Sequence, residues 1–391
     1  MIGQAFKLIW NQKGKHLGLF VEIFFSFIVL FLVFSFSIYN LQEYFSPLGY
    51  EYENVWAISL NREGMEKEAS LLVDEQIELA LNSYQEVEKF TWSQNNIPFA
   101  NTSNSSGLGR GNAYIDNVQR FVVDDRYEET LKLDLVEGRW FEEQDELKEK
   151  SPFILTENLA QELFPEGSAI GEKLRFGDGE GDYREIIGVV SDYRYRGGIM
   201  ESGYSFFIRK NEDRLLSNIL LKVNEKANAA FESRLMKQLH QIAPGYSMEI
   251  RYIDEMRSNF LLVSFIPLLI LGIIGVFLIF NVALGLFGVL WQNISQRKQE
   301  IGVRRAMGAS KAEVSIQFML EIIVLASISL VLGIFFAVQF PLLDVFGLKP
   351  GIYILAIVFA VISIYLLVTV CALIPSAQAA ELHPAIALRE E

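Results

Sequence analysis

The chain has 391 residues, with 48 acidic and 34 basic side chains and a formal net charge of −14, yet 51% of its residues are hydrophobic. The charge is unevenly distributed: residues 39–259 contain 40 acidic and 24 basic side chains, a net of −16, whereas the remainder contains 8 and 10, a net of +2. These numbers exclude a disordered chain and a nucleic-acid-binding protein, which would need a basic face. The single cysteine, Cys371, also excludes a disulfide scaffold.

Four stretches are apolar and long enough to cross a bilayer, which takes about 20 helical residues. They cover residues 17–38, 260–290, 322–343 and 352–374. The second is longer than a bilayer requires, so we expect it to tilt or to project from the membrane. We interpret the first as an uncleaved anchor, because a cleaved signal peptide would have a shorter apolar run and a small-residue cleavage site.

The distribution of basic residues predicts the orientation of these segments. Lysines precede the first stretch, and lysines and arginines are concentrated between the second and the third. Because basic loops stay in the cytoplasm, residues 1–16 and the carboxyl terminus are predicted to be cytoplasmic and residues 39–259 extracytoplasmic.

Residues 39–259 show the pattern of an α+β domain. A strand, a helix and a strand are predicted near its beginning, and the same order recurs near its end. This arrangement predicts a split ferredoxin-like core with an inserted subdomain at about residues 95–217. Residues 101–111 are rich in Asn, Ser and Gly, so we expect the insertion to open with a flexible, turn-rich segment. The strands predicted for the core cover residues 55–60, 87–92, 219–223 and 247–253, and the predicted helices cover residues 64–84 and 226–242.

No convincing catalytic, metal or cofactor site is found in the sequence. His240 is the only histidine of the extracytoplasmic region, which leaves no zinc cluster. Residues 167–173 superficially resemble a phosphate loop but lack its spacing. The many carboxylates are interpreted as a solvated acidic face. Glu22 lies inside the first apolar stretch, where we expect it to reach the interface or to pair with Lys15 or a neighbouring helix; a proton relay is the weaker alternative.

The loop between the second and third apolar stretches, residues 297–310, has its own local signals. Its first part is predicted to be a short basic amphipathic helix that Gly308 ends. Ser310 and Glu313 have the spacing of a capping box that starts the next helix. Such a helix could bind a cytoplasmic partner, although its basic residues could also reflect membrane topology alone.

The sequence of this loop resembles that of the MacB/FtsX-like permeases of ABC transporters. Residues 300–310 read EIGVRRAMGAS, close to the EIGIRRALGAS pattern of that family, and QFMLE follows at 317–321. The tail PAIALRE at 384–390 and the segments 137–141 and 187–192 are also similar to family patterns. The resemblance therefore extends over the whole chain.

The resemblance implies a multi-pass protein of the bacterial cytoplasmic membrane, with residues 39–259 as a MacB-like periplasmic core domain and residues 260–391 as an FtsX-like permease domain. Nothing in the chain resembles an ATPase domain, so ATP and Mg²⁺ are expected in a separate ATPase subunit. A second permease, identical or paralogous, is expected as a partner, and a membrane-fusion protein and membrane lipid are further candidates. The resemblance assigns ATPase coupling to nine residues: Glu300, Ile301, Gly302, Val303, Arg304, Arg305, Ala306, Met307 and Gly308.

Two functions remain open at this point. The first is a permease that passes ATP-driven motion to the extracytoplasmic domain (mechanotransmission) for export of a peptide, antibiotic or lipoprotein-like substrate. The second is a regulatory receptor, using the same coupling, that controls external cell-wall enzymes or envelope-stress signalling. The sequence names neither the cargo nor the signal.

Overall fold

The computed structural model describes residues 13–62, 64–148, 150–177, 181–197, 203–211 and 215–380. The chain divides into two compact units. One is Glu43–Ser264, termed here the large domain. The other combines Met1–Gln42 with Phe265–Glu391 and is termed the helical unit.

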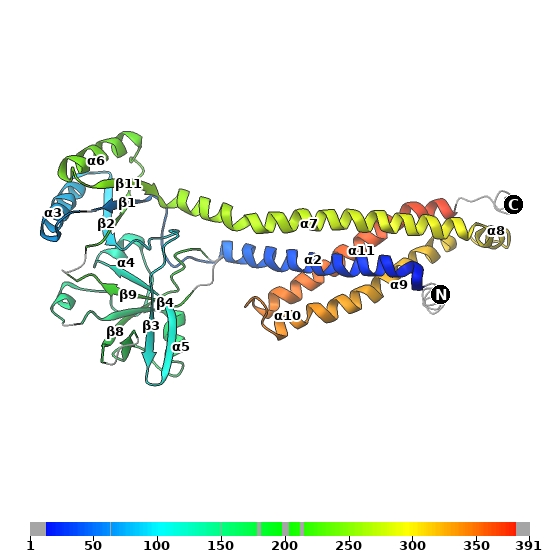
Figure 1. The fold of residues 1–391 in the computed structure, drawn as a ribbon, viewed down its shortest axis with the longest axis horizontal. Helices are drawn as coiled ribbons and strands as arrows, with labels where there is room; N and C mark the ends of the chain where they lie inside the picture. Colours follow the sequence, from blue (N-terminus) through cyan, green and yellow to red (C-terminus); the bar gives the residue numbers. More distant parts are fainter. Residues whose placement is uncertain are drawn as a thin grey trace. The chain divides into compact units, whose positions relative to one another are not determined.

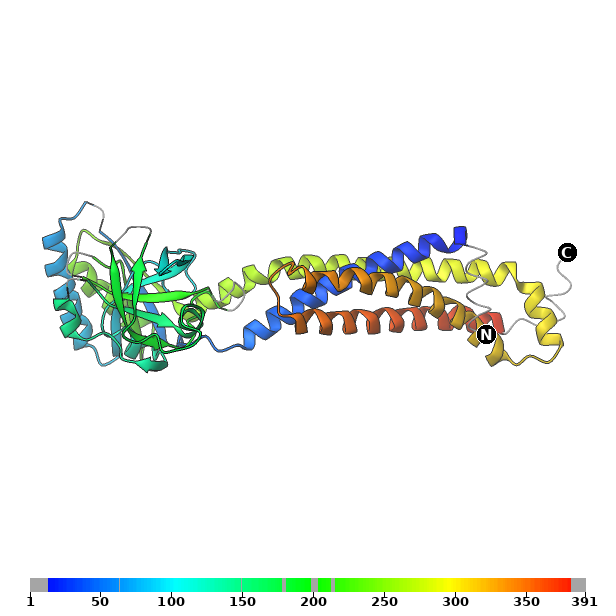
Figure 2. The same ribbon diagram turned by 90° about the horizontal axis from the view of Figure 1, so that it is seen from below.

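Four helices are long and apolar enough to cross a membrane, which confirms the predicted α-helical membrane protein with a large α+β domain after its first span. The second of them, α7, has 44 residues and extends beyond the predicted stretch at both ends. The long helices of the helical unit run alongside one another in both views (Figures 1 and 2). The helices are α2 (Lys13–Phe45), α7 (Ile253–Gln296), α8 (Lys298–Ala306), α9 (Lys311–Ala337), α10 (Gln339–Leu342) and α11 (Pro350–Ala380).

One hydrophobic cluster joins α2, α7, α9 and α11. On α11, Ala356, Ala360 and Ile364 recur every four residues and are fully buried, so they form one face of that helix. Small residues at such positions let helices approach closely. Gly333 on α9 has the same effect, because a Cβ atom there would lie 2.5 Å from the ring of Phe27 on α2.

Glu22 lies on α2 against the neighbouring helix α7. A Cβ atom at Gly285 of α7 would be only 2.5 Å from the Glu22 carboxylate, so a glycine at this position makes room for the acidic side chain. The structure thus places Glu22 beside a neighbouring helix, one of the two expected partners; the side chain of the other, Lys15, lies outside the described residues.

The core of the large domain is a four-stranded antiparallel sheet with the order β11-β1-β10-β2. The chain order strand, helix, strand, strand, helix, strand in this sheet is that of a split ferredoxin-like fold. The prediction of that core is therefore confirmed. Its elements are β1 (Val55–Asn61), α3 (Lys67–Ser83), β2 (Val87–Ser93), β10 (Asn218–Val223), α6 (Ala229–Ile242) and β11 (Ser247–Tyr252).

Strand β1 shows why this sheet forms. Its residues alternate between two clusters: Trp56 and Ile58 pack with α3 and α6, and Val55 and Ala57 pack on the opposite face. All four are buried, so both faces of the strand are covered. The run of four apolar residues at the start of this strand fits a strand that is covered on both faces.

The segment between β2 and β10 forms a second group of strands. β4 pairs with β3, β3 with β7, β7 with β8, β8 with β6, and β6 with β9. Because β9 also pairs with β4, in parallel, these six strands close into a ring. β5 pairs with β8, outside this ring. The elements are β3 (Ser105–Arg110), β4 (Ala113–Val123), α4 (Tyr127–Leu131), β5 (Leu135–Gly138), η1 (Glu143–Leu147), β6 (Phe153–Thr156), α5 (Glu157–Leu163), β7 (Lys173–Phe176), β8 (Tyr183–Val190) and β9 (Ser205–Arg209).

The expectation of a flexible segment at residues 101–111 was wrong for its second half, which is strand β3. The glycines there serve packing. A Cβ atom at Gly107 would lie 1.7 Å from the Tyr114 hydroxyl, and one at Gly109 would lie 3.0 Å from the Arg175 guanidinium. Large side chains on the two paired strands therefore cross over the glycines, a use of strand glycine that composition alone does not reveal.

Candidate functional site

The segment predicted to couple to an ATPase contains helix α8. The helix follows α7 after a turn at Arg297 and has nine residues. It ends at Ala306, and Gly308, two residues further on, has a φ of +100°, a conformation that glycine adopts readily. The Ala309 N–H donates to the Arg304 carbonyl oxygen over 3.0 Å, which satisfies an end group of the helix. The break predicted at Gly308 is present.

One face of α8 is fixed by apolar contacts. Ile301 is only 3% exposed and packs in a cluster with Ile294 of α7 and with Val314 and Phe318 of α9. This small core joins the ends of three helices. It holds α8 in place without using the residues on the outer side of the helix.

A chain of polar contacts supplements that core. Arg297 donates through one guanidinium nitrogen to both carboxylate oxygens of Glu321, at 3.0 and 3.1 Å, and its guanidinium lies over the ring of Phe318. Arg304 donates to the side-chain oxygen of Gln317, and the side-chain nitrogen of Gln317 donates to the Glu321 carboxylate over 3.3 Å. Arg304 therefore helps to attach α8 to α9.

The opposite side of α8 is apolar and exposed. Val303 is 44% exposed and Met307, just past the last helical residue, is 77% exposed. They are four residues apart, a spacing that places them on the same side. Ala306 is also exposed, whereas Gly302 is buried. The side chains of Glu300 and Arg305 lie outside what the structure describes.

The next helix, α9, begins at a capping box. The Ser310 hydroxyl accepts a hydrogen bond from the Glu313 N–H over 3.2 Å, and the Glu313 carboxylate accepts one from the Ser310 N–H over 2.7 Å. These reciprocal bonds satisfy free donors at the start of the helix. They fix the point where the chain turns from α8 into the third apolar helix.

The structure thus brings some predicted site residues together and separates others. Ile301 and Arg304 face α9, whereas Val303, Ala306 and Met307 are exposed. The residue assignment missed Ile294, Phe318 and the pairing of Arg297 with Glu321. These contacts left only a weak signal in the sequence, because the two residues of each contact belong to different segments of the chain.

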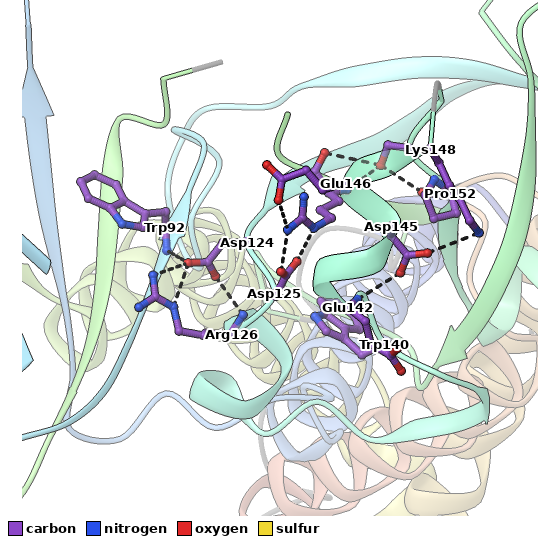
Figure 3. A network of polar contacts seen from close by, with 12 residues as sticks. Trp92, Asp124, Asp125, Arg126, Trp140, Glu142, Asp145, Glu146, Lys148 and Pro152 are labelled. Atoms are coloured by element: carbon purple, nitrogen blue, oxygen red, sulfur yellow. Dashed lines mark hydrogen bonds and ion pairs between the residues drawn. The ribbon is translucent and has the colours of Figure 1, made fainter. Parts of the chain in front are cut away.

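Several charged side chains of the large domain form ion pairs within the fold. The Arg209 guanidinium contacts both Asp125 oxygens at 2.6 and 2.7 Å and Glu146 at 3.1 Å (Figure 3). Arg209 is 9% exposed, so its charge is compensated inside the fold. Among the described residues no group of three or more potential metal ligands is found.

Two further carboxylates of this network differ in their titration. Burial by itself would raise the pKa of Asp145, but hydrogen bonds from Arg139, the Glu142 backbone and Lys148 outweigh it and lower the pKa to about 2. Burial raises the pKa of Asp124 despite its contacts with Arg126 (Figure 3). Both carboxylates accept hydrogen bonds from neighbouring groups within the domain.

Comparisons with known proteins agree with the features of both units. Residues 23–238 match the family model of the MacB-like periplasmic core domain, and residues 272–384 match that of the FtsX-like permease C-terminal region. The first match alone covers more than half of the chain.

Individual relatives are distant in sequence. The chain is 26% identical over 245 residues to the macrolide export ATP-binding/permease protein MacB of Aggregatibacter actinomycetemcomitans, covering 60% of this chain and 37% of that protein. It is 25% identical over 293 residues to the ABC transporter permease YvrN of Bacillus subtilis, covering 70% of each. The crystal structure of the periplasmic region of MacB from Actinobacillus actinomycetemcomitans aligns with a TM-score of 0.39 and 17% identity, over 54% of this chain and 93% of that one.

Proposed function

Because the chain belongs to the family of ABC transporter permeases with a MacB-like periplasmic core domain and an FtsX-like permease region, we propose that it is the membrane subunit of an exporter driven by a separate ATPase. The four apolar helices and the family together make it an inner-membrane protein. In the proposed topology both termini and α8 are cytoplasmic and the large domain is extracytoplasmic.

The exposed side of α8 is the observation that carries this proposal. Val303 and Met307 present apolar surface on the outer side of α8. The contacts of Ile301 on the inner side hold this helix in place. An anchored helix with an apolar outer face suits insertion into a groove of a partner protein. The partner proposed here is the ATPase subunit, which would bind the ATP and Mg²⁺. Dimerisation with a second permease is part of the same proposal.

Helix α7 supplies a route for mechanical coupling. It begins at Ile253, directly after β11, and runs as one helix to Gln296, two residues before α8. Movement of α8 on ATP binding would act on the end of α7. Pro267 lies inside this helix and removes one backbone hydrogen bond, so bending is expected there. The relatives are permeases and export proteins, and nothing in the described residues favours the regulatory alternative.

The test is to replace Met307 or Val303 with Glu in the full-length protein and to measure how much ATPase subunit co-purifies. Each charge would have to be buried in the partner's groove, so we expect at least about a tenfold loss of association. Met307→Leu keeps the apolar volume and should retain binding. Unchanged co-purification of both Glu variants would show that this side of α8 is not the docking surface.

Arg304 provides a separate comparison. Because Arg304 donates to Gln317, Arg304→Glu should loosen α8 from α9 and affect the ATPase indirectly. The cargo, of which a peptide, an antibiotic and a lipoprotein-like molecule are the candidates, can be identified from the proteins and small molecules that remain with the complex.

A further inference from the structure

A cavity of about 530 Å³ lies within the large domain, beside the first turns of α7. Met256, Phe260 and Val263 contribute one wall and recur every three to four residues, so they share one face of α7. Phe99 adds a further aromatic wall. A cavity of this volume is in the range of sites that hold small organic ligands.

The polar part of this cavity is positively charged. Arg196 and Arg251 line it, and no Asp or Glu is among its described lining residues. The carboxylate of Glu249 lies 3.9 Å from the Arg251 guanidinium, but that side chain is 70% exposed, so solvent screens much of its charge. The cavity is thus cationic in a region whose net charge is −16 (40 acidic and 24 basic side chains over residues 39–259).

Both arginines are held in place by neighbours. Arg251 donates to the Ser59 hydroxyl over 2.7 Å, and Arg196 donates to the Asn101 carbonyl oxygen over 2.8 Å. An arginine fixed in this way loses less conformational entropy when it binds an anion than a mobile side chain does. The positions of the two charges are therefore set before any ligand arrives.

Phe99 supports the assignment of a binding site independently. Its backbone has a φ of +58°, an unfavourable conformation for a non-glycine residue. The Phe99 N–H donates to the Tyr195 carbonyl oxygen over 2.6 Å, and the Phe99 ring packs near Tyr52 and Phe260. Local strain of this kind is concentrated at ligand-binding positions, and here it presents an aromatic ring to the cavity.

We propose that this cavity binds an anionic phospholipid, with the phosphate between Arg196 and Arg251 and the first acyl carbons against Phe99, Phe260 and Val263. Arginine binds phosphate oxygens through charge-assisted hydrogen bonds. A lipid is favoured over a soluble anion because the apolar wall belongs to a helix that is long and apolar enough to cross a membrane.

The experiment uses the full-length protein in a mild detergent, with bound lipids counted by native mass spectrometry. Phosphatidylglycerol and phosphatidylcholine with identical acyl chains are titrated separately. We expect one phosphatidylglycerol to bind tightly to the wild-type protein. Its binding to the double variant Arg196→Gln/Arg251→Gln should be at least about tenfold weaker. Phosphatidylcholine should bind equally to the wild-type protein and to the double variant. The control is Arg234→Gln, which removes an arginine that is 57% exposed on α6 and should bind like wild type.

A second variant keeps the test decisive if the double variant does not fold. Asn259 lines the cavity and is exposed, so Asn259→Trp fills the space while both arginines remain. It should weaken phosphatidylglycerol binding to a similar extent. Equal binding by wild type and Asn259→Trp would overturn the proposal. So would complete competition by glycerol 3-phosphate at the same concentration as the lipid, since the site would then take a soluble phosphate and not a membrane lipid.

Discussion

The ion pair of Asp145 with Arg139 allows a quantitative prediction for the large domain. The Asp145 side chain is fully inaccessible to solvent and accepts hydrogen bonds from both terminal nitrogens of Arg139, at 2.6 and 2.8 Å. Its pKa is lowered from 3.8 to about 2, a change of about 1.8 units (3.8 − 2). At 1.36 kcal/mol per unit this corresponds to about 2.4 kcal/mol of stabilisation at neutral pH.

The effective value should be smaller, because Arg139 is 35% exposed and solvent screens its charge. We therefore expect Asp145→Asn to destabilise the surrounding segment by about 1–2 kcal/mol at pH 7. The folded pKa lies below the unfolded one, so this stabilisation is complete above about pH 4 and is lost as the pH falls towards 2.

Hydrogen–deuterium exchange of the full-length protein measures this change locally. Peptides that include the 3₁₀ helix η1 should exchange about 5–30-fold faster in Asp145→Asn than in wild type, the factor that corresponds to 1–2 kcal/mol. Glu129→Gln is the control, because it removes an exposed pair with Lys89 whose side chains are 64% and 44% exposed. If Asp145→Asn changed exchange no more than this control, the pKa argument would be refuted.

Three further predictions follow from single positions. Gly333→Ala should lower the melting temperature of the purified chain, because its Cβ atom would overlap the buried ring of Phe27, whereas Gly288→Ala, with no atom within 4 Å of its Cβ, should not. Ser310→Ala should cost about 1 kcal/mol through loss of the cap, seen as faster exchange in the first turn of α9 and nowhere in α11. Burial raises the pKa of Asp74 to about 6. Since the folded pKa is raised, protection of α3 from exchange should decrease as the pH rises from about 4 to 6; a flat profile would contradict this.

Local sequence patterns were sufficient for much of this structure. Long apolar runs identified four helices that could cross a membrane. The strand and helix order around the insertion identified the ferredoxin-like core. Gly308 and the spacing of Ser310 and Glu313 located the end of one helix and the start of the next. Each helix or strand in these patterns is recognised from nearby residues, because hydrogen bonds within helices and the side-chain periodicity of helices and strands are local.

Contacts between distant segments could be decided only by the tertiary structure. The pairing of β9 with both β4 and β6 closes a ring of strands, and no local pattern specifies which edges meet. Likewise, the EIGVRRAMGAS motif located the coupling segment, but its packing against α9 determined that Ile301 is buried and Met307 exposed. The same is true of the overall charge. The sequence determined that residues 39–259 are strongly acidic, whereas folding places Arg196 and Arg251 together around one cavity, because packing and hydrogen bonds between distant residues decide which charges become neighbours.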